Sequence, residues 1–239
     1  MRPLIALIAA LTLSACVAPT QTAAPSTTAR STTAQPHNVP MSVARAIEVT
    51  RRMEPIAESF CRSRTQGQNC DFEFLVNRDP RAGVNAFQAL HPENGRPVIT
   101  LTVGLIRAVR NDDELAFVIG HEVAHHIAQH IAQQEAAARA GALIFGASAQ
   151  QRGGNREQII EAAQAGALLG ARQFSQSAEL EADSLGTQIT CRAGFDALAG
   201  ARFFSLLPDP RAGILSTHPP NAARVATVRR AVAQHCGLA

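Results

Sequence analysis

Apolar and polar positions along the chain predict helices at both ends of a folded part and short strands between them. Short apolar runs with β-branched or aromatic residues, bounded by turn signals such as Asn-Arg-Asp-Pro and Pro-Glu-Asn-Gly, are typical of strands. We therefore expect an α+β fold that is mostly helical, with a small sheet of about three strands. The predicted elements are a helix over residues 43–59, strands over 72–76, 84–89 and 98–103, a helix that begins near Asp112, a helical stretch that breaks at 152–155 and resumes over 157–191, and helices over 195–207 and 221–235.

The most informative stretch is residues 111–130, where His121-Glu122-Val123-Ala124-His125 has the pattern H-E-x-x-H. Asn111 followed by Glu114 is a capping-box pattern, which indicates that a helix begins here. Residues four apart lie on one face of a helix, so the two histidines can share a zinc ion. Glu122 beside them can polarise a metal-bound water. The alternative is a helix whose histidines are placed by chance. We expect the small sheet to lie beside this helix.

A second pair of histidines, His126 and His130, also stands four residues apart. Ile127 occupies the position where the first pair has its glutamate. This pair therefore lacks a base, and we expect it to be exposed or to lie behind the metal ligands.

A third zinc ligand is expected, because zinc hydrolases keep three protein ligands and one open position. The segment 178–183 supplies the candidate, Glu179. On a helical wheel Glu179 and Asp183 share a face with small and apolar residues, whereas Glu181 falls on the polar face. A buried acid needs a partner. Zinc would satisfy Glu179, and the free N–H of a ligand histidine could satisfy Asp183.

The N-terminal segment has the pattern of an exported lipoprotein. Residues 1–15 combine Arg2 with a short apolar run, as in a secretory signal. Leu-Ser-Ala-Cys16 resembles the bacterial lipobox, which implies cleavage before Cys16 and its acylation, with ordinary signal cleavage nearby as the alternative. Residues 16–41 are rich in Thr, Ala, Pro and Ser and predict a flexible tether. Residues 42–239 then form one domain, which we expect at the periplasmic face of the outer membrane.

The composition argues against nucleic-acid binding, and the cysteines indicate disulfides. The net charge is +3, with scattered basic residues and no Trp or Tyr, so nucleic-acid binding has no support. An exported domain with four further cysteines favours disulfides. Of the three possible pairings we favour Cys61–Cys70 and Cys191–Cys236, which would close a short loop and hold the C-terminal helix. Spacing leaves the other pairings open.

The order of motifs resembles the gluzincin zinc metallopeptidase family of HtpX and the CaaX prenyl endopeptidase. H-E-x-x-H is followed about fifty residues later by E-x-x-A-D, and then by Ser-Thr-His218-Pro-Pro with Arg224 beyond. The resemblance covers about residues 43–235 and is closest to the periplasmic lipoprotein branch of BepA and LoiP. The sequence departs from the family at Ser175-Gln176, where the family often has Ser-Arg. It also shows no tetratricopeptide repeats and no multiple membrane spans of the kind that some members have.

The resemblance implies roles for two further residues. His218 would stabilise the oxyanion, or else act as a fourth ligand that keeps the enzyme latent. Arg224 would fix its loop through an acid such as Asp183.

These patterns together predict an endopeptidase with one Zn²⁺ per chain, acting on unfolded or misassembled envelope proteins. Its partners would be those substrates, the membrane through the lipid anchor alone, and outer-membrane assembly machinery. A non-catalytic assembly factor and a zinc amidase acting on cell-wall peptides are the alternatives. The Ala- and Gly-rich segment 132–172 is expected to fold as a helical hairpin, either a lid over the site or a rigid scaffold.

Overall fold

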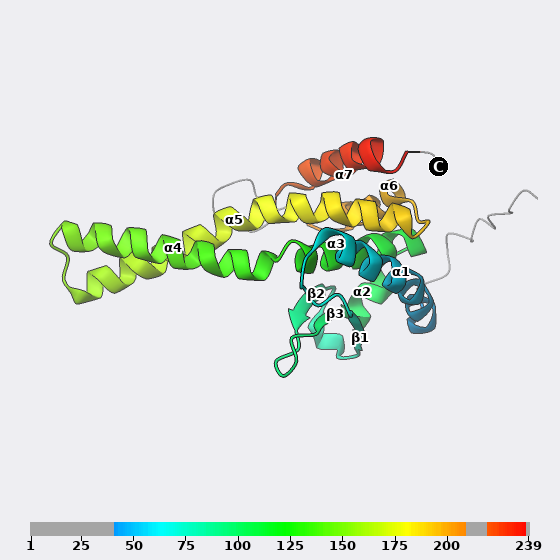
Figure 1. Ribbon diagram of the computed structural model, residues 1–239, viewed down its shortest axis with the longest axis horizontal. Coiled ribbons are helices and arrows are strands. Elements are labelled where there is room, and N and C mark those ends of the chain that lie inside the picture. The colour runs from blue at the N-terminus through cyan, green and yellow to red at the C-terminus, as the bar shows by residue number, and fades with distance from the viewer. Residues whose placement is uncertain (1–40, 209–218, 238–239) are drawn as a thin grey trace, which may run out of the picture. The chain divides into compact units, whose positions relative to one another are not determined.

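Helices make up most of the molecule, and a small sheet lies against them (Figure 1). The computed structural model describes residues 41–208 and 219–237. The mostly helical α+β class and the three-stranded sheet are confirmed. The elements are α1 (Val43–Arg64), β1 (Glu73–Asn77), η1 (Pro80–Ala82), β2 (Ala86–Leu90), β3 (Pro97–Thr102), α2 (Val103–Ala108), α3 (Asp112–Ile127), α4 (His130–Gln151), α5 (Arg156–Arg192), α6 (Ala197–Gly200), η2 (Ala201–Leu206) and α7 (Asn221–His235).

The sheet has the strand order β1-β3-β2, with β3 parallel to β1 and antiparallel to β2. All six residues of β3 are buried, as expected for a central strand. Strand β2 is an edge strand that lies next to α3. Asn85 accepts a hydrogen bond from the backbone of Thr102, and the backbone N–H of His91 donates to Arg96. Since peptide groups alternate along a strand, those of Ala86 and Gln88 face the other way, towards α3.

Helix α3 is the centre of the core, with twelve buried residues among its sixteen. Asn111 caps it by accepting a hydrogen bond from the N–H of Glu114 at 2.9 Å. The capping box does not close reciprocally, because the buried Glu114 carboxylate bonds instead to the backbone and guanidinium of Arg110. An ion pair between Arg45 and Asp112 joins the start of α1 to the start of α3.

Glycines set the crossing of α3 over α5. A Cβ placed on Gly186 would lie 2.8 Å from the backbone nitrogen of His121, and one on Gly120 would lie 2.8 Å from the carbonyl oxygen of Gly186. Side chains at either position would therefore push the two helices apart. This close approach brings the acidic face of α5 against the histidine face of α3.

Two parts of the fold differ from the sequence-based prediction. Helix α2 was not predicted, because its six residues are too few to show a periodic pattern. The single helix predicted over 195–207 is divided into α6 and η2. The division falls at Gly200, where a Cβ would lie 2.6 Å from the carbonyl oxygen of Asp113, so the chain must turn closely against α3.

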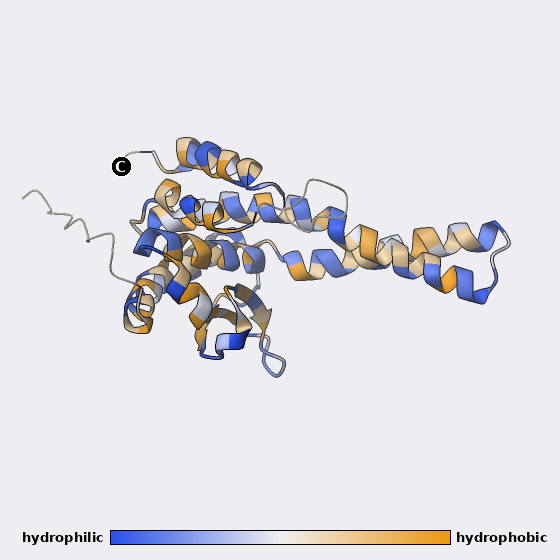
Figure 2. Ribbon diagram, turned by 180° about the vertical axis from the view of Figure 1, so that it is seen from behind, coloured by the Kyte–Doolittle hydropathy of each residue, from blue (hydrophilic) through white to orange (hydrophobic). Residues whose placement is uncertain are grey.

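Helix α4 and the first half of α5 form an antiparallel hairpin, with its tip at residues 152–155 (Figure 1). Glycines lie between the two helices: a Cβ on Gly141 would overlap the carbonyl oxygen of Gly166. Large apolar side chains of the hairpin are exposed instead, with Leu143 and Ile144 at 73% and 66%. Figure 2 shows hydrophobic residues along both helices of the hairpin. Within the described ranges, no helix combines the length and hydropathy that crossing a bilayer requires.

Both favoured disulfides are present. Cys61 at the end of α1 is bonded to Cys70 ahead of β1, with a Cα–Cα distance of 5.7 Å. Cys191 near the end of α5 is bonded to Cys236 after α7, with a Cα–Cα distance of 5.8 Å. The second bond joins the helix that carries the acidic motif to the helix that carries Arg224.

Candidate metal centre

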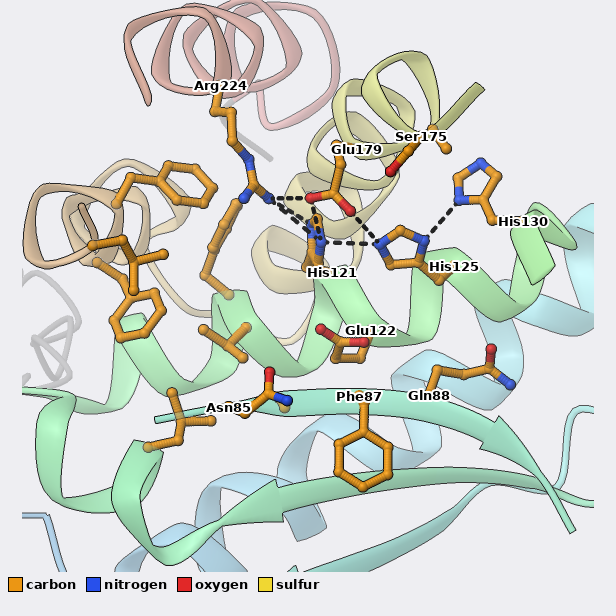
Figure 3. Close-up of a pocket in the computed structure, with 18 of the residues that line it drawn as sticks. Asn85, Phe87, Gln88, His121, Glu122, His125, His130, Ser175, Glu179 and Arg224 are labelled. Carbon is orange, nitrogen blue, oxygen red and sulfur yellow. Dashed lines mark hydrogen bonds and ion pairs between the residues drawn. The ribbon is translucent and has the colours of Figure 1, made fainter. Parts of the chain in front are cut away.

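Two histidines of α3 and one glutamate of α5 converge at one point (Figure 3). The Nε2 atoms of His121 and His125 are 3.0 Å apart. The carboxylate oxygens of Glu179 lie 3.5 Å from the first and 3.4 Å from the second. Zinc bonds of about 2.0–2.1 Å at tetrahedral angles require ligand atoms roughly 3.3 Å apart. The three donors therefore fit zinc in both kind and spacing.

Asp183 holds His121 from the side away from this point, and Arg224 bridges Asp183 and Glu179. The Nδ1 atom of His121 lies 3.0 Å from the carboxylate of Asp183, which is fully buried. Arg224 donates two hydrogen bonds to Asp183, at 2.7 and 2.8 Å, and also lies 3.3 Å from the Glu179 carboxylate. The guanidinium of Arg224 stacks on the ring of Phe204 at 4.0 Å. A carboxylate on the free nitrogen of a ligand histidine fixes both its tautomer and its orientation.

The charges of this cluster favour a bound cation. Burial and the charge of Arg224 lower the pKa of His121, but hydrogen bonds to Asp183 and Glu179 outweigh them and raise this pKa to about 10. Burial alone would raise the pKa of Asp183, but hydrogen bonds from Arg224 and His121 hold it below its usual value. Burial lowers the pKa of His125. The carboxylates thus stabilise positive charge at the point where the Nε2 atoms meet, which suits a divalent metal.

Glu122 points to the other side of α3, between this helix and β2 (Figure 3). Burial raises the pKa of Glu122, while the backbone N–H of Gln88 donates to its carboxylate and opposes that shift. A carboxyl group with a raised pKa beside an electrophilic centre can accept a proton and return it.

The three proposed ligands, Glu122 and Arg224 line one cavity of about 430 Å³. Strand β2 forms one wall, and α5 with α7 forms the opposite one, with α3 between them (Figure 3). His130, Ile131 and Phe174, from the base of the hairpin, also line it. Apolar side chains line the rest of the cavity, among them Leu105, Phe117, Val118, Phe203 and Leu207.

The structure brings together most of the residues that the sequence singled out. Glu179 and Asp183 are buried and Glu181 is exposed, as the helical wheel predicts. His126 and His130 are both buried rather than exposed. His126 bonds to the carbonyl oxygen of Asn69 at 2.7 Å, whereas His130 contacts His125.

Some predicted features cannot be compared with the structure, and some structural features were not predicted. Cys16, the tether and His218 lie outside the described residues. Sequence reasoning did not identify His125 as the ligand that His130 contacts, and it missed the backbone of Gln88 in the cavity. Neither has a local sequence signal, because each depends on how separate elements meet.

Comparison with known proteins agrees with this geometry. Residues 44–232 match peptidase family M48. A Vibrio cholerae serotype O1 protein, provisionally named a beta-barrel assembly-enhancing protease, is 31% identical over 180 residues. These residues are 69% of this chain but 35% of the relative, so the chain spans about a third of that protein's length. The match covers most of the chain and includes both halves of the histidine and glutamate cluster, so the chain belongs to peptidase family M48.

Proposed function

We propose that this chain is a zinc-dependent endopeptidase that cleaves unfolded or misassembled envelope proteins. One observation carries the proposal: three donor atoms of His121, His125 and Glu179 converge at zinc-like spacing, and Glu122 lines the same cavity. Membership of a peptidase family supports the same activity. One Zn²⁺ per chain is the cofactor that this set of two imidazoles and one carboxylate suits.

The chain's own residues divide the work of peptide hydrolysis. When bound, zinc supplies Lewis-acid chemistry that polarises the scissile carbonyl and acidifies the attacking water. Glu122 accepts the proton of that water and delivers it to the leaving amine. The developing oxyanion needs a further hydrogen-bond donor. We assign that role to His218 because of the motif in which it stands, and the same residue would hold the enzyme latent if it occupied the open position.

An extended polypeptide fits this cavity better than a compact ligand. The peptide groups of Ala86 and Gln88 face the cavity from an edge strand, and an edge strand can pair with an extended substrate. The apolar wall around Phe117 and Phe203 can accept a large side chain of that substrate. Apolar side chains are available in extended segments of unfolded proteins, which supports a role in quality control.

Location and partners are proposed from the N-terminal pattern and the relative. A lipid on Cys16 and the tether that follows it would keep the protease at the periplasmic face of the outer membrane. The relative is named for enhancing β-barrel assembly, and this name supports outer-membrane assembly machinery as the partner that we propose. Replacing Cys16 with Ala should abolish incorporation of a labelled fatty acid and release the protein from membranes. Lipid label in the Cys16→Ala protein would contradict this location.

The activity is tested with Glu122→Gln, which removes the base and keeps every proposed ligand. Purified proteins are incubated with unfolded casein and with cell-wall fragments, with and without a chelator, and their zinc content is measured. The parent should cleave casein unless chelated, while Glu122→Gln should bind zinc and lose about 10²–10⁴-fold in rate. Glu135→Gln, an exposed glutamate of α4, is the matched control.

Each other result has a definite meaning. Near-parent casein cleavage by Glu122→Gln with zinc bound would contradict the mechanism. Cleavage of cell-wall fragments alone would show an amidase. Binding of casein without cleavage would show an assembly factor.

A further inference from the structure

His130 contacts the ligand His125 directly. Their Nδ1 atoms are 2.9 Å apart, and the Nε2 atom of His130 lies 3.3 Å from the carboxylate of Glu181. The His130 side chain is 4% exposed, and the ring of Phe174 packs on it edge to face. Figure 3 shows His130 pointing at His125 from beyond the end of α3.

A continuous helix would not allow this contact. Residues five apart on a helix are rotated by about 140° from each other, so their side chains diverge. Here the helix is interrupted: α3 ends at Ile127, and Gln129 has φ 57° and ψ 36° in the left-handed region. Gln129 is the one residue other than glycine with positive φ among residues 41–208 and 219–237.

The left-handed turn therefore directs His130 back towards the metal centre. Left-handed backbone is uncommon for a residue with a side chain, and it persists where surrounding contacts hold it. The buried contacts of His130 with His125 and Phe174 are of this kind.

The hydrogen-bonding capacity of the three groups fixes a single direction of donation. If His125 binds metal through Nε2, its Nδ1 carries the proton and donates to the Nδ1 of His130. His130 then carries its own proton on Nε2 and donates it to the carboxylate of Glu181. On the other ligand, His121, the carboxylate of Asp183 does the same work directly.

We propose that His130 and Glu181 are positioning residues, which orient His125 and fix its tautomer for metal binding. The inference rests on the proposed function, since it concerns the same metal. Asp183 orients His121 directly through its carboxylate. For His125, the imidazole of His130 lies between the ligand and the carboxylate of Glu181 and has the same orienting role. Glu181 is 58% exposed, so its share of the effect is the smaller.

Metal affinity provides the test, by competition of each purified protein with a chromogenic chelator for zinc. His130→Ala should weaken zinc binding about 10- to 100-fold, the usual cost of losing such a partner. His130→Asn should recover most of that loss, because its amide oxygen can accept from the Nδ1 of His125. Glu181→Gln should lose less than His130→Ala. Glu135→Gln and His235→Ala, both exposed and remote from the ligands, should bind zinc as the parent does.

A second readout separates positioning from general loss of structure. The visible spectrum of the cobalt-substituted protein should shift in His130→Ala and return towards that of the parent in His130→Asn. Urea unfolding of the metal-free proteins shows whether each variant is folded.

Parent-like zinc affinity and cobalt spectrum in folded His130→Ala would overturn the inference, as would an Asn variant no better than Ala. Failure of the parent to bind zinc would instead overturn the proposed function. Loss of zinc by Glu179→Gln, with parent-like binding in His130→Ala, would leave the proposed function standing and reject the inference alone.

Discussion

The two halves of α5 pack against their neighbours in opposite ways. The C-terminal half crosses α3, and it buries Glu179 and Asp183 among charged and histidine partners. The N-terminal half pairs with α4 through small residues, and it leaves Ile160 and Leu168 45% and 51% exposed. One continuous helix thus joins a region whose polar groups are inside to a region whose apolar groups are outside.

The difference implies that the metal-centre half of α5 is held more rigidly than the hairpin half. A buried charge without a partner is costly, so separating Asp183 from His121 and Arg224 is unfavourable. The hairpin buries little apolar area, and such regions open at low free energy. It begins at His130 and returns at Phe174, both of which line the cavity, so its movement could change access to the site. That it acts as a lid stays a prediction.

The largest expected difference in stability between the two halves of α5 comes from breaking the buried pair at the metal end. Asp183→Asn removes the charge opposite Arg224, whose side chain is 8% exposed. We expect a loss of about 3 kcal/mol in the free energy of unfolding, at the lower end for a broken buried pair because Glu179 still lies near Arg224. Urea denaturation measures this loss. The matched control is Glu161→Gln in the hairpin half of α5, where an exposed acid should change stability by less than about 0.5 kcal/mol. Equal losses in the two variants would contradict the contrast between the two halves.

A second pair of variants places the same methyl group in each half of α5. Gly186→Ala puts a Cβ 2.8 Å from the backbone nitrogen of His121, and Gly166→Ala puts one so close to the carbonyl oxygen of Gly141 that the two atoms overlap. Overpacking costs about 1–3 kcal/mol in each case, partly offset by the better helix propensity of Ala. Only Gly186→Ala should also weaken zinc binding, because it moves α3 away from Glu179.

Hydrogen exchange of the same two variants shows where each loss occurs. In Gly166→Ala, faster exchange should be confined to α4 and the first half of α5. Weakened zinc binding in Gly166→Ala would show that the hairpin and the metal centre are not independent.

Much of this contrast could be predicted from the sequence, because it depends on local patterns. The predicted strands differ from the observed ones by one or two residues at each end, and the break in the hairpin at residues 152–155 was predicted from its glycines. The helical wheel of residues 178–189 separated the buried acids from Glu181. Gln188 falls on the same side of this wheel as Glu181, yet it is 5% exposed, and Arg64 of α1 donates a hydrogen bond to its amide oxygen.

What could not be predicted depends on backbone conformations without a sequence signature. The left-handed residue after α3 is Gln129, where glycine or asparagine would have given a signal. An uninterrupted helix through residue 129 would instead turn His130 about 140° away from His125. The close packing of α3 on α5 could not be predicted either. In a sequence, Gly120 and Gly186 only weaken the helical pattern, and their contact with each other becomes visible once both helices are positioned.

The smallest expected effect on stability concerns the outward apolar side chains of the hairpin. Leu143→Ala and Ile144→Ala remove side chains that are 73% and 66% exposed, so each should change the free energy of unfolding by less than about 0.5 kcal/mol. Ile119→Ala in α3 is the matched reference, and it should cost about 2–5 kcal/mol because Ile119 is fully buried. Urea denaturation of the purified proteins at two concentrations measures all three. A loss above about 1 kcal/mol at Ile144 would show that this face is covered in solution, and a loss that grows with protein concentration would identify the cover as a second copy of the chain.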